Sequence, residues 1–194
     1  MHYAIILAAG ASRRMGVDKA SLPWGKDHTL LSYQVAQWHQ AGVRAIAVVN
    51  CHNQQLAQLT NLWRVVVNPN PELGKTYSIK LGLQALPAKF SSVTISAVDQ
   101  PRPAQVYQQM IAAQATSGKA VIAPRRGHPL LFAARLLPDL MEISEESLGL
   151  RRVMHQHYLE IFHVDMGDAL MDINTPEDYQ KFQSQSRLPA SDGS

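Results

Sequence analysis

The 194-residue chain has little cysteine, and its one thiol, Cys51, has no partner for an internal disulfide. This usage is typical of a reducing compartment. Long apolar runs are also missing, because no stretch approaches the about 20 residues that a membrane-spanning helix needs. The first residues hold no cationic segment followed by an apolar stretch, as a secretory signal would. We therefore expect a cytoplasmic protein that does not span a membrane.

Charge is sparse and only slightly unbalanced. Charged residues make up 17% of the chain, and the formal net charge is +3 at pH 7. Much of the basic excess falls in expected loops rather than along one continuous face. This placement disfavours a nucleic-acid partner and favours a polyphosphate ligand. The residues concerned are Arg13, Arg14, Lys19, Lys26, Arg125 and Arg126.

Several familiar site patterns are absent as well. There is no Ser-His-Asp or Cys-His arrangement, and the neighbouring His155 and His157 have no third metal ligand. The glycine fingerprint G-x-G-x-x-G does not occur. Gly10 and Gly16 are one residue too far apart for a Walker loop, and Lys19 is followed by alanine. These absences disfavour a nicotinamide-dependent oxidoreductase and a Walker-type nucleotidase.

The pattern that is present is an alternation of short apolar runs with amphipathic segments. It predicts a single α/β domain with a doubly wound, mostly parallel sheet that is covered on both faces. The expected domain spans residues 1–183, and a disordered tail rich in Ser, Gln, Pro and Gly spans 184–194. The predicted strands are 4–7, 45–49, 63–67, 93–97, 120–123, 129–133 and 159–164. The predicted helices are 29–41, 54–59, 76–86, 103–117 and 148–157.

The segment 7–19 is the most informative part of the sequence. Small residues after a buried strand let backbone N–H groups approach an anion closely. The cations Arg13, Arg14 and Lys19 then supply positive charge where a phosphate chain would lie. A solvated basic turn is the structural alternative. The nucleotide-binding residues expected here are Leu7, Ala8, Ala9, Gly10, Ser12, Arg14 and Lys19.

Two carboxylates are candidate metal ligands. Asp99 follows the fourth predicted strand, and Asp172 precedes a helix start at Thr175 and Pro176. On neighbouring strand ends they would share one Mg²⁺, which binds through one or two carboxylates plus substrate phosphates. The alternative for Asp99 is that it caps the helix that follows it.

Gly74, Ser78 and Gly82 recur every four residues and therefore lie on one face of a helix. For Gly82 we favour close helix packing. Gly74 and Ser78 lie at the helix start, where a base or ribose can rest on the backbone, and packing is the alternative there too. The later segment 125–129 holds two arginines, a glycine and His128 at a strand entrance. It predicts contacts to an anionic second substrate, the alternative being an exposed basic turn.

Taken together, these motifs resemble those of the MobA-like nucleotidyltransferase family, and within it the molybdenum cofactor cytidylyltransferases. The resemblance runs in family order from residue 5 to residue 179 and implies a Rossmann-like domain that binds a nucleoside triphosphate with Mg²⁺. Members that use GTP typically read Leu-Ala-Gly-Gly at the loop start. Here Ala9 occupies the third position, and its methyl group narrows the space for a base, which favours CTP. The matching motifs are 7–19, 22–25, 68–69, 74–82, 99–101, 127–129 and 172–178.

The resemblance implies transfer of a CMP group from CTP to the phosphate of molybdopterin, with release of pyrophosphate. Arg14, Lys19 and Asp99 would be the catalytic residues, with Asp99 and Asp172 as metal ligands. Asn68, Gly74 and Ser78 would join the nucleotide site. Gln100, Arg126 and His128 would contact the acceptor. A molybdoenzyme that receives the product is an expected partner.

The sequence departs from the family where the second substrate is expected. Relatives usually have Gly-Asp where this chain has Glu146 and Ser147, and the loop before Gly127 is shorter. Three alternatives therefore stay open at this point. They are a GTP-using molybdenum cofactor enzyme, a sugar- or polyol-phosphate nucleotidyltransferase of the same fold, and a non-catalytic cofactor carrier or insertion chaperone.

Overall fold

The computed structural model describes residues 1–10, 15–58, 60–125, 127–165 and 172–186, with side chains as far as 183. A seven-stranded sheet forms the centre, in the order β5-β4-β1-β6-β8-β7-β9. Its strands are β1 (His2–Ala8), β4 (Arg44–Val49), β5 (Arg64–Val67), β6 (Ser92–Ala97), β7 (Val121–Pro124), β8 (Leu130–Ala133) and β9 (Ile161–Val164). All seven predicted strands are confirmed within a few residues.

The sheet is mostly parallel, as predicted. β1 pairs in parallel with β4 and β6, β4 with β5, and β7 with β9. β8 is the exception, because it runs antiparallel to both β6 and β7. The five residues between β7 and β8 are too few for a parallel crossover, which needs about a dozen or more. The short loop therefore forces β8 to run back along β7.

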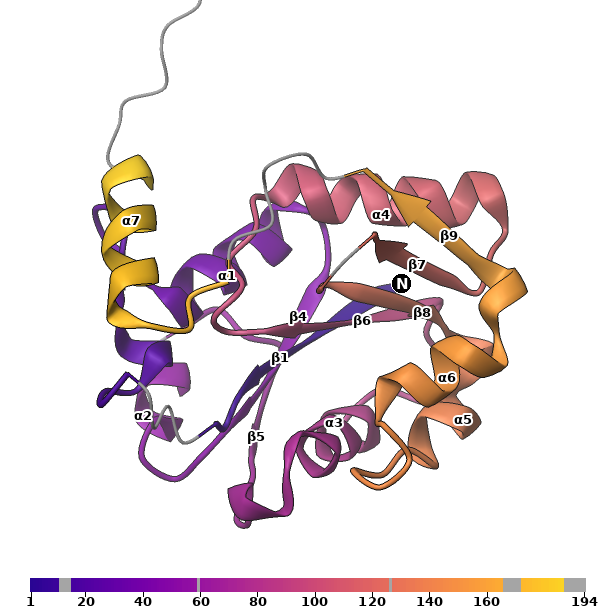
Figure 1. Cartoon of the computed structure of the whole chain (residues 1–194), viewed down its shortest axis with the longest axis horizontal. Coiled ribbons are helices and arrows are strands. Elements are labelled where there is room, and N and C mark those ends of the chain that lie inside the picture. Colours follow the sequence, from indigo (N-terminus) through magenta and orange to yellow (C-terminus); the bar gives the residue numbers. More distant parts are fainter. Residues whose placement is uncertain (11–14, 59, 126, 166–171, 187–194) are drawn as a thin grey trace, which may run out of the picture.

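Helices cover both faces of the sheet and produce three layers (Figure 1). One face is covered chiefly by α1 and α4, and the other by α3, α5 and α6. The helices are α1 (Leu30–Gln40), α2 (Gln54–Gln58), α3 (Lys75–Gln84), α4 (Ala104–Ser117), α5 (Leu137–Met141), α6 (Leu150–Gln156) and α7 (Pro176–Ser186). The doubly wound α/β prediction is confirmed. In the part of the chain that is described, no helix has the length and apolarity needed to cross a bilayer.

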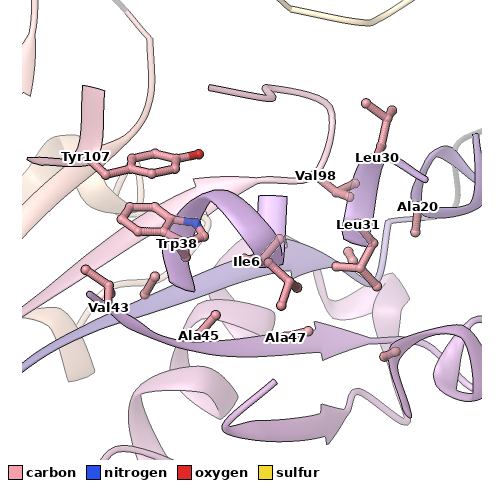
Figure 2. Packing of buried hydrophobic residues seen from close by; sticks show 14 of the residues in the cluster. Ile6, Ala20, Leu30, Leu31, Trp38, Val43, Ala45, Ala47, Val98 and Tyr107 are labelled. Carbon is pink, nitrogen blue, oxygen red and sulfur yellow. The ribbon is translucent and has the colours of Figure 1, made fainter. Parts of the chain in front are cut away.

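The core consists of two apolar clusters, one on each face of the sheet. Figure 2 shows part of the first, in which Ile6 of β1 lies under α1 and the rings of Trp38 and Tyr107 stack between α1 and α4. In β1, Ile5 turns to the opposite face and joins the second cluster. A strand buried on both faces reads as a continuous apolar run, which is why β1 was recognisable in the sequence.

Several elements differ from the sequence prediction. A small antiparallel hairpin, β2 (Pro23–Trp24) with β3 (His28–Thr29), and the short α5 had not been predicted. Two-residue strands and a five-residue helix carry too little periodicity to be recognised. α7 begins at the expected position and extends to Ser186, into the segment for which disorder was expected. Residues 187–194 lie outside the described part of the chain.

Candidate functional site

A cleft of about 530 Å³ opens where β1 and β6 end. Adjacent parallel strands place their carboxyl ends at the same edge of the sheet, where α/β proteins bind ligands. Loops that are remote in sequence therefore meet there. The cleft is lined by Leu7, Ala8, Ala9, Gly10, Lys19, Pro71, Gly74, Lys75, Ser78, Ala97, Val98, Asp99 and Gln100. Most of the described residues predicted to bind the nucleotide thus lie around one cavity. The predicted residues Ser12, Arg14 and Arg126 lie outside the described residues.

Lys19 and Asp99 form an ion pair in this cleft. Lys19 Nζ lies 2.7 Å from Asp99 Oδ2, and the side chains are 12% and 24% exposed. Lys19 also lies 3.5 Å from Asn174 Oδ1. A short 3₁₀ turn carries the lysine, and the Asp18 side chain caps that turn by accepting from Ala20 N at 2.9 Å. This partly buried cation is therefore held at the carboxyl end of the sheet.

Asp99 does not cap the helix that follows it. The first backbone N–H of α4, at Ala104, donates instead to Gln37 Oε1 at 2.9 Å. Pro103 stands at the N-cap position and makes no side-chain cap. The capping alternative for Asp99 is therefore wrong, and its carboxylate is directed to Lys19 in the cleft.

Gln34 holds the segment that leads into Asp99. This α1 side chain is fully buried, and its Nε2 donates to the carbonyls of Ala97 at 3.0 Å and Val98 at 2.8 Å. Two hydrogen bonds to consecutive carbonyls fix the backbone immediately before the carboxylate. Sequence reasoning missed this role, although a polar residue on the apolar face of a helix was the available signal.

Asp172 reaches the site by a different route from the one predicted. The sequence analysis placed it on a strand end next to that of Asp99. However, β9 lies at the far edge of the sheet, and Asp172 comes eight residues after its last residue. The next residue, Ile173, is buried and its backbone N–H donates to the carbonyl of Asp99 at 2.9 Å. A backbone hydrogen bond, not strand adjacency, brings the two acidic segments together.

Arg102 lies next to Asp172 and is almost completely buried. Its Nη2 lies 3.5 Å from Asp172 Oδ1, and its Nη1 donates to the carbonyl of Pro101 at 3.1 Å. Burial lowers the pKa of Arg102, while Tyr107 and Asp172 oppose that shift. A guanidinium stays charged in proteins. This arginine, which the sequence analysis did not single out, therefore adds a fixed positive charge under the acidic segments.

The two carboxylates fit a divalent cation by their chemistry. The Ile173 N–H that donates to the Asp99 carbonyl brings the segment holding Asp172 next to Asp99. The described residues contain no group of three or more His, Cys, Asp or Glu side chains that could hold a metal. Mg²⁺ needs no such cage, because one or two carboxylates suffice when substrate phosphates complete its shell. Asp99 and Asp172 are the residues that would hold it.

The predicted small-residue stripe on α3 has two different uses. A Cβ at Gly82 would lie 2.6 Å from Ile5 Cγ2, so the packing interpretation of Gly82 is confirmed. Ser78 lines the cleft, and its Oγ accepts from Asn68 Nδ2 at 2.9 Å. Asn68 itself is 1% exposed and does not line the cleft. Asn68 therefore positions the Ser78 hydroxyl through this hydrogen bond.

The start of α3 is covered by an acidic side chain. Gly74 has φ +93, a backbone conformation that favours glycine, and a Cβ there would meet the Glu145 carboxyl group. Glu145 Oε1 accepts from Thr76 N at 2.7 Å and from Thr76 Oγ1 at 2.9 Å. Glu145 therefore caps α3, which has no cap of its own. Nothing in the sequence pattern links two residues 69 positions apart.

A second cleft of about 800 Å³ has the start of α3 in its wall, at Lys75 and Thr76. Its wall combines apolar groups such as Met154 and Tyr158 with the cations Arg125 and Arg151. The segments around Gly127 and around Leu148 both contribute to it. The residues that these segments contribute are Arg125, Gly127, His128, Glu145, Leu148, Gly149, Leu150 and Arg151.

His128 lies in this second cleft, whereas Gln100 lines the first. Burial, followed by the positive charge of Lys75, lowers the pKa of His128 to about 4. The imidazole is therefore neutral near pH 7, and its Nε2 lies 3.1 Å from Lys75 Nζ. Gln100 Oε1 is buried and has no hydrogen-bond partner within the described residues. Of the three residues predicted for the acceptor, the two that the structure describes thus line different clefts.

The chain is a nucleotidyltransferase by family, because it belongs to the MobA-like NTP transferase family, whose model matches residues 4–161. It is similar to the molybdenum cofactor cytidylyltransferase of Escherichia coli K12. The two are 26% identical over 184 residues, which cover 90% of this chain and 92% of that protein.

The fold is shared with solved structures, including the following two. A nucleotidyl transferase from Methanothermobacter, Mth528, superposes with a TM-score of 0.79 at 23% identity, covering 96% of this chain and 97% of that one. A manganese complex of Rv0371C from Mycobacterium tuberculosis has a TM-score of 0.75 at 21% identity, covering 94% and 97%. The Rossmann-like prediction is confirmed by these likenesses.

Proposed function

We propose that this protein transfers the CMP group of CTP to the phosphate of molybdopterin and releases pyrophosphate. The observation that carries the proposal is the convergence of segment 7–10, Lys19 and Asp99 on one cleft, next to a second cleft with cationic and apolar walls. The first cleft fits a triphosphate and the second fits a phosphorylated organic acceptor. The named E. coli relative supports the same pair of substrates.

The reaction is an in-line displacement at the α-phosphorus of CTP. An oxygen of the acceptor phosphate forms the new P–O bond. The bond from the α-phosphorus to the oxygen bridging to the β-phosphate breaks, and its electron pair leaves with pyrophosphate. An ionised phosphate needs no general base, so the chain's contribution is alignment and charge stabilisation. This agrees with the lack of a catalytic triad in the sequence.

Each part of the first cleft has a task in this scheme. Backbone N–H groups of Ala8 to Gly10 face the phosphates, and Lys19 offsets the charge that develops on the departing pyrophosphate. Asp99 and Asp172 would hold Mg²⁺, which would supply charge neutralisation at the α-phosphate. A structural neighbour that binds manganese is consistent with a divalent cation here.

Ala9 supports CTP over GTP. Its side chain is 2% exposed, lines the first cleft and packs with the apolar cluster that includes Leu7 and Ile5. Because the methyl group is fixed between the sheet and the cavity, it reduces the space available to a purine. Gly at this position would enlarge the cavity at the point where GTP-using relatives carry glycine.

The test is incubation with Mg²⁺, molybdenum-loaded molybdopterin and each of CTP, GTP, ATP and UTP in turn. Pyrophosphate release is measured and the product is identified by mass. The expected result is release with CTP and a molybdopterin product heavier by one CMP group. Release with GTP alone, or with a sugar or polyol phosphate in place of molybdopterin, would contradict the proposal. The same incubation with divalent cations chelated is the inactive control.

A further inference from the structure

Lys75 joins the two clefts. It opens α3, and it is the one residue in the described part of the chain that lines both cavities. Its side chain is accessible to solvent within them. The surrounding concave wall lowers the pKa of Lys75 by burial, while Asp99, Glu145 and Asp172 oppose that shift. A cation thus stands between the place where a nucleotide fits and the place where an acceptor fits.

The ammonium of Lys75 is held in position without being neutralised by a bonded carboxylate. Its Nζ lies 3.1 Å from Nε2 of the neutral His128 imidazole. No carboxylate within the described residues forms an ion pair with it. Since a lysine ammonium carries three donors, one hydrogen bond to His128 leaves two for a ligand. Two donors on one nitrogen suit an oxyanion.

We infer that Lys75 binds the phosphate of the acceptor and holds it between the clefts for attack on the nucleotide. This inference rests on the proposed function and names a residue that the acceptor phosphate touches. Two N–H groups of Lys75 donate hydrogen bonds to two oxygens of the acceptor phosphate, and the third oxygen forms the bond to the α-phosphorus. Pyrophosphate leaves with the electron pair of the broken bond, and no proton moves because the phosphate is ionised.

Two observations assign Lys75 to the acceptor rather than to the triphosphate tail. The hydrogen bond to His128 draws its ammonium toward the second cleft, where His128 lies. The first cleft already holds a cation of its own in Lys19, which is carried by the loop after β1. Glu145 accepts from the neighbouring backbone N–H of Thr76, so this N–H is not available to that phosphate.

The kinetic test compares Lys75→Met with Lys75→Arg and with Lys80→Met, a matched loss of charge on the same helix outside both clefts. Lys75→Met is expected to raise the KM for molybdopterin about ten- to a hundredfold, as loss of a charge-assisted contact does. Its Kd for CTP with Mg²⁺, measured by calorimetry without acceptor, stays within about twofold. Lys75→Arg recovers most of the acceptor KM, and Lys80→Met behaves as the wild type.

A second test measures binding without turnover. Orthophosphate is the ligand, and its binding is monitored by ³¹P NMR line broadening. It is run in a Lys19→Ala background so that phosphate in the first cleft contributes little. Adding Lys75→Met is expected to weaken orthophosphate binding at least fivefold, and adding Lys80→Met leaves it unchanged. Folding of each variant is checked by near-UV circular dichroism.

The outcomes separate this inference from the proposed function. Unchanged phosphate affinity and acceptor KM in Lys75→Met would overturn it. So would a weakened CTP affinity with an unchanged acceptor KM, since Lys75 would then serve the triphosphate. Orthophosphate binding that depends on Lys75, in a protein that releases no pyrophosphate from any triphosphate, supports a phosphate site at Lys75, overturns its role in transfer and refutes the proposed function.

Discussion

Lys19 and Asp99 lie 80 residues apart in the chain and meet with 2.7 Å between Nζ and Oδ2. The contact joins the loop after β1 to the loop after β6, two strands that pair directly in the sheet. A cation and a carboxylate thus lie together in one cleft. The cation complements a triphosphate, and the carboxylate complements the metal ion bound to that triphosphate. Ligand binding is expected to rearrange this pair, since both side chains have roles toward the substrate.

Lys19→Ala is expected to lower kcat on the order of a hundredfold while the fold persists, because one charged contact to the departing pyrophosphate is lost. Lys26→Ala removes an exposed lysine of the hairpin turn and serves as the matched control. Pyrophosphate release measures the effect. Equal rates in the two variants, with folding verified, would exclude Lys19 from the reaction.

Chelation of divalent cations is expected to abolish turnover, and Asp99→Asn to raise the Mg²⁺ concentration needed for half-maximal rate by at least tenfold. An amide is a weaker ligand for a hard cation than a carboxylate. Titration of activity against Mg²⁺ for wild type, Asp99→Asn and Asp172→Asn checks this. A metal dependence identical in all three proteins would show that the cation binds elsewhere.

Gln34→Leu is expected to lower the free energy of unfolding by about 1–3 kcal/mol, because the buried carbonyls of Ala97 and Val98 lose their donor. The same change is expected to weaken metal binding by loosening the backbone before Asp99. Gln40→Leu, on the exposed end of α1, is the comparison. Denaturant titration gives the free energy of unfolding of each variant. The prediction is contradicted if Gln34→Leu is as stable as Gln40→Leu.

Gly82→Ala is expected to destabilise the protein by about 1–3 kcal/mol through overpacking. The new methyl would lie 2.6 Å from Ile5 Cγ2 and 3.1 Å from Val48 Cγ2, both on buried β-branched side chains. At Gly10 a Cβ meets nothing within 4 Å, so Gly10→Ala is expected to keep its stability and to lose nucleotide affinity instead. Denaturation midpoints and CTP binding for the two variants separate packing from function.

The free energy of unfolding is expected to fall as pH is lowered from about 6.5 to 4. Burial depresses the pKa of His128 to about 4, from an ordinary value of 6.5. The unfolded chain therefore takes up a proton in this window that the native protein does not, and stability is lost as pH falls. His128→Gln is expected to reduce the change in the free energy of unfolding between pH 6.5 and 5. Ordinary carboxylates titrate below this range and therefore contribute little to the change. His2, whose pKa is also lowered by burial, contributes to the pH dependence in the same direction.

The sequence analysis succeeded where local pattern determines position. The apolar runs predicted the strands, and their order placed segment 7–10, Lys19 and Asp99 at the same edge of the sheet. It failed where loops fold over one another. The contacts between Lys75 and His128 and between Glu145 and Thr76 span 53 and 69 residues, and no periodicity encodes such distances. Arg102 was overlooked because a buried arginine between two prolines looks like an exposed turn.

The most direct measurement is a crystal structure of the protein with Mg²⁺ and a non-hydrolysable CTP analogue. The account predicts phosphates against the backbone of Ala8 to Gly10, with Lys19 on the tail and the metal on Asp99. The cytosine would lie near Ala9 and Ser78. A triphosphate bound elsewhere, or Asp99 still paired with Lys19 beside a cleft without ligand, would contradict it.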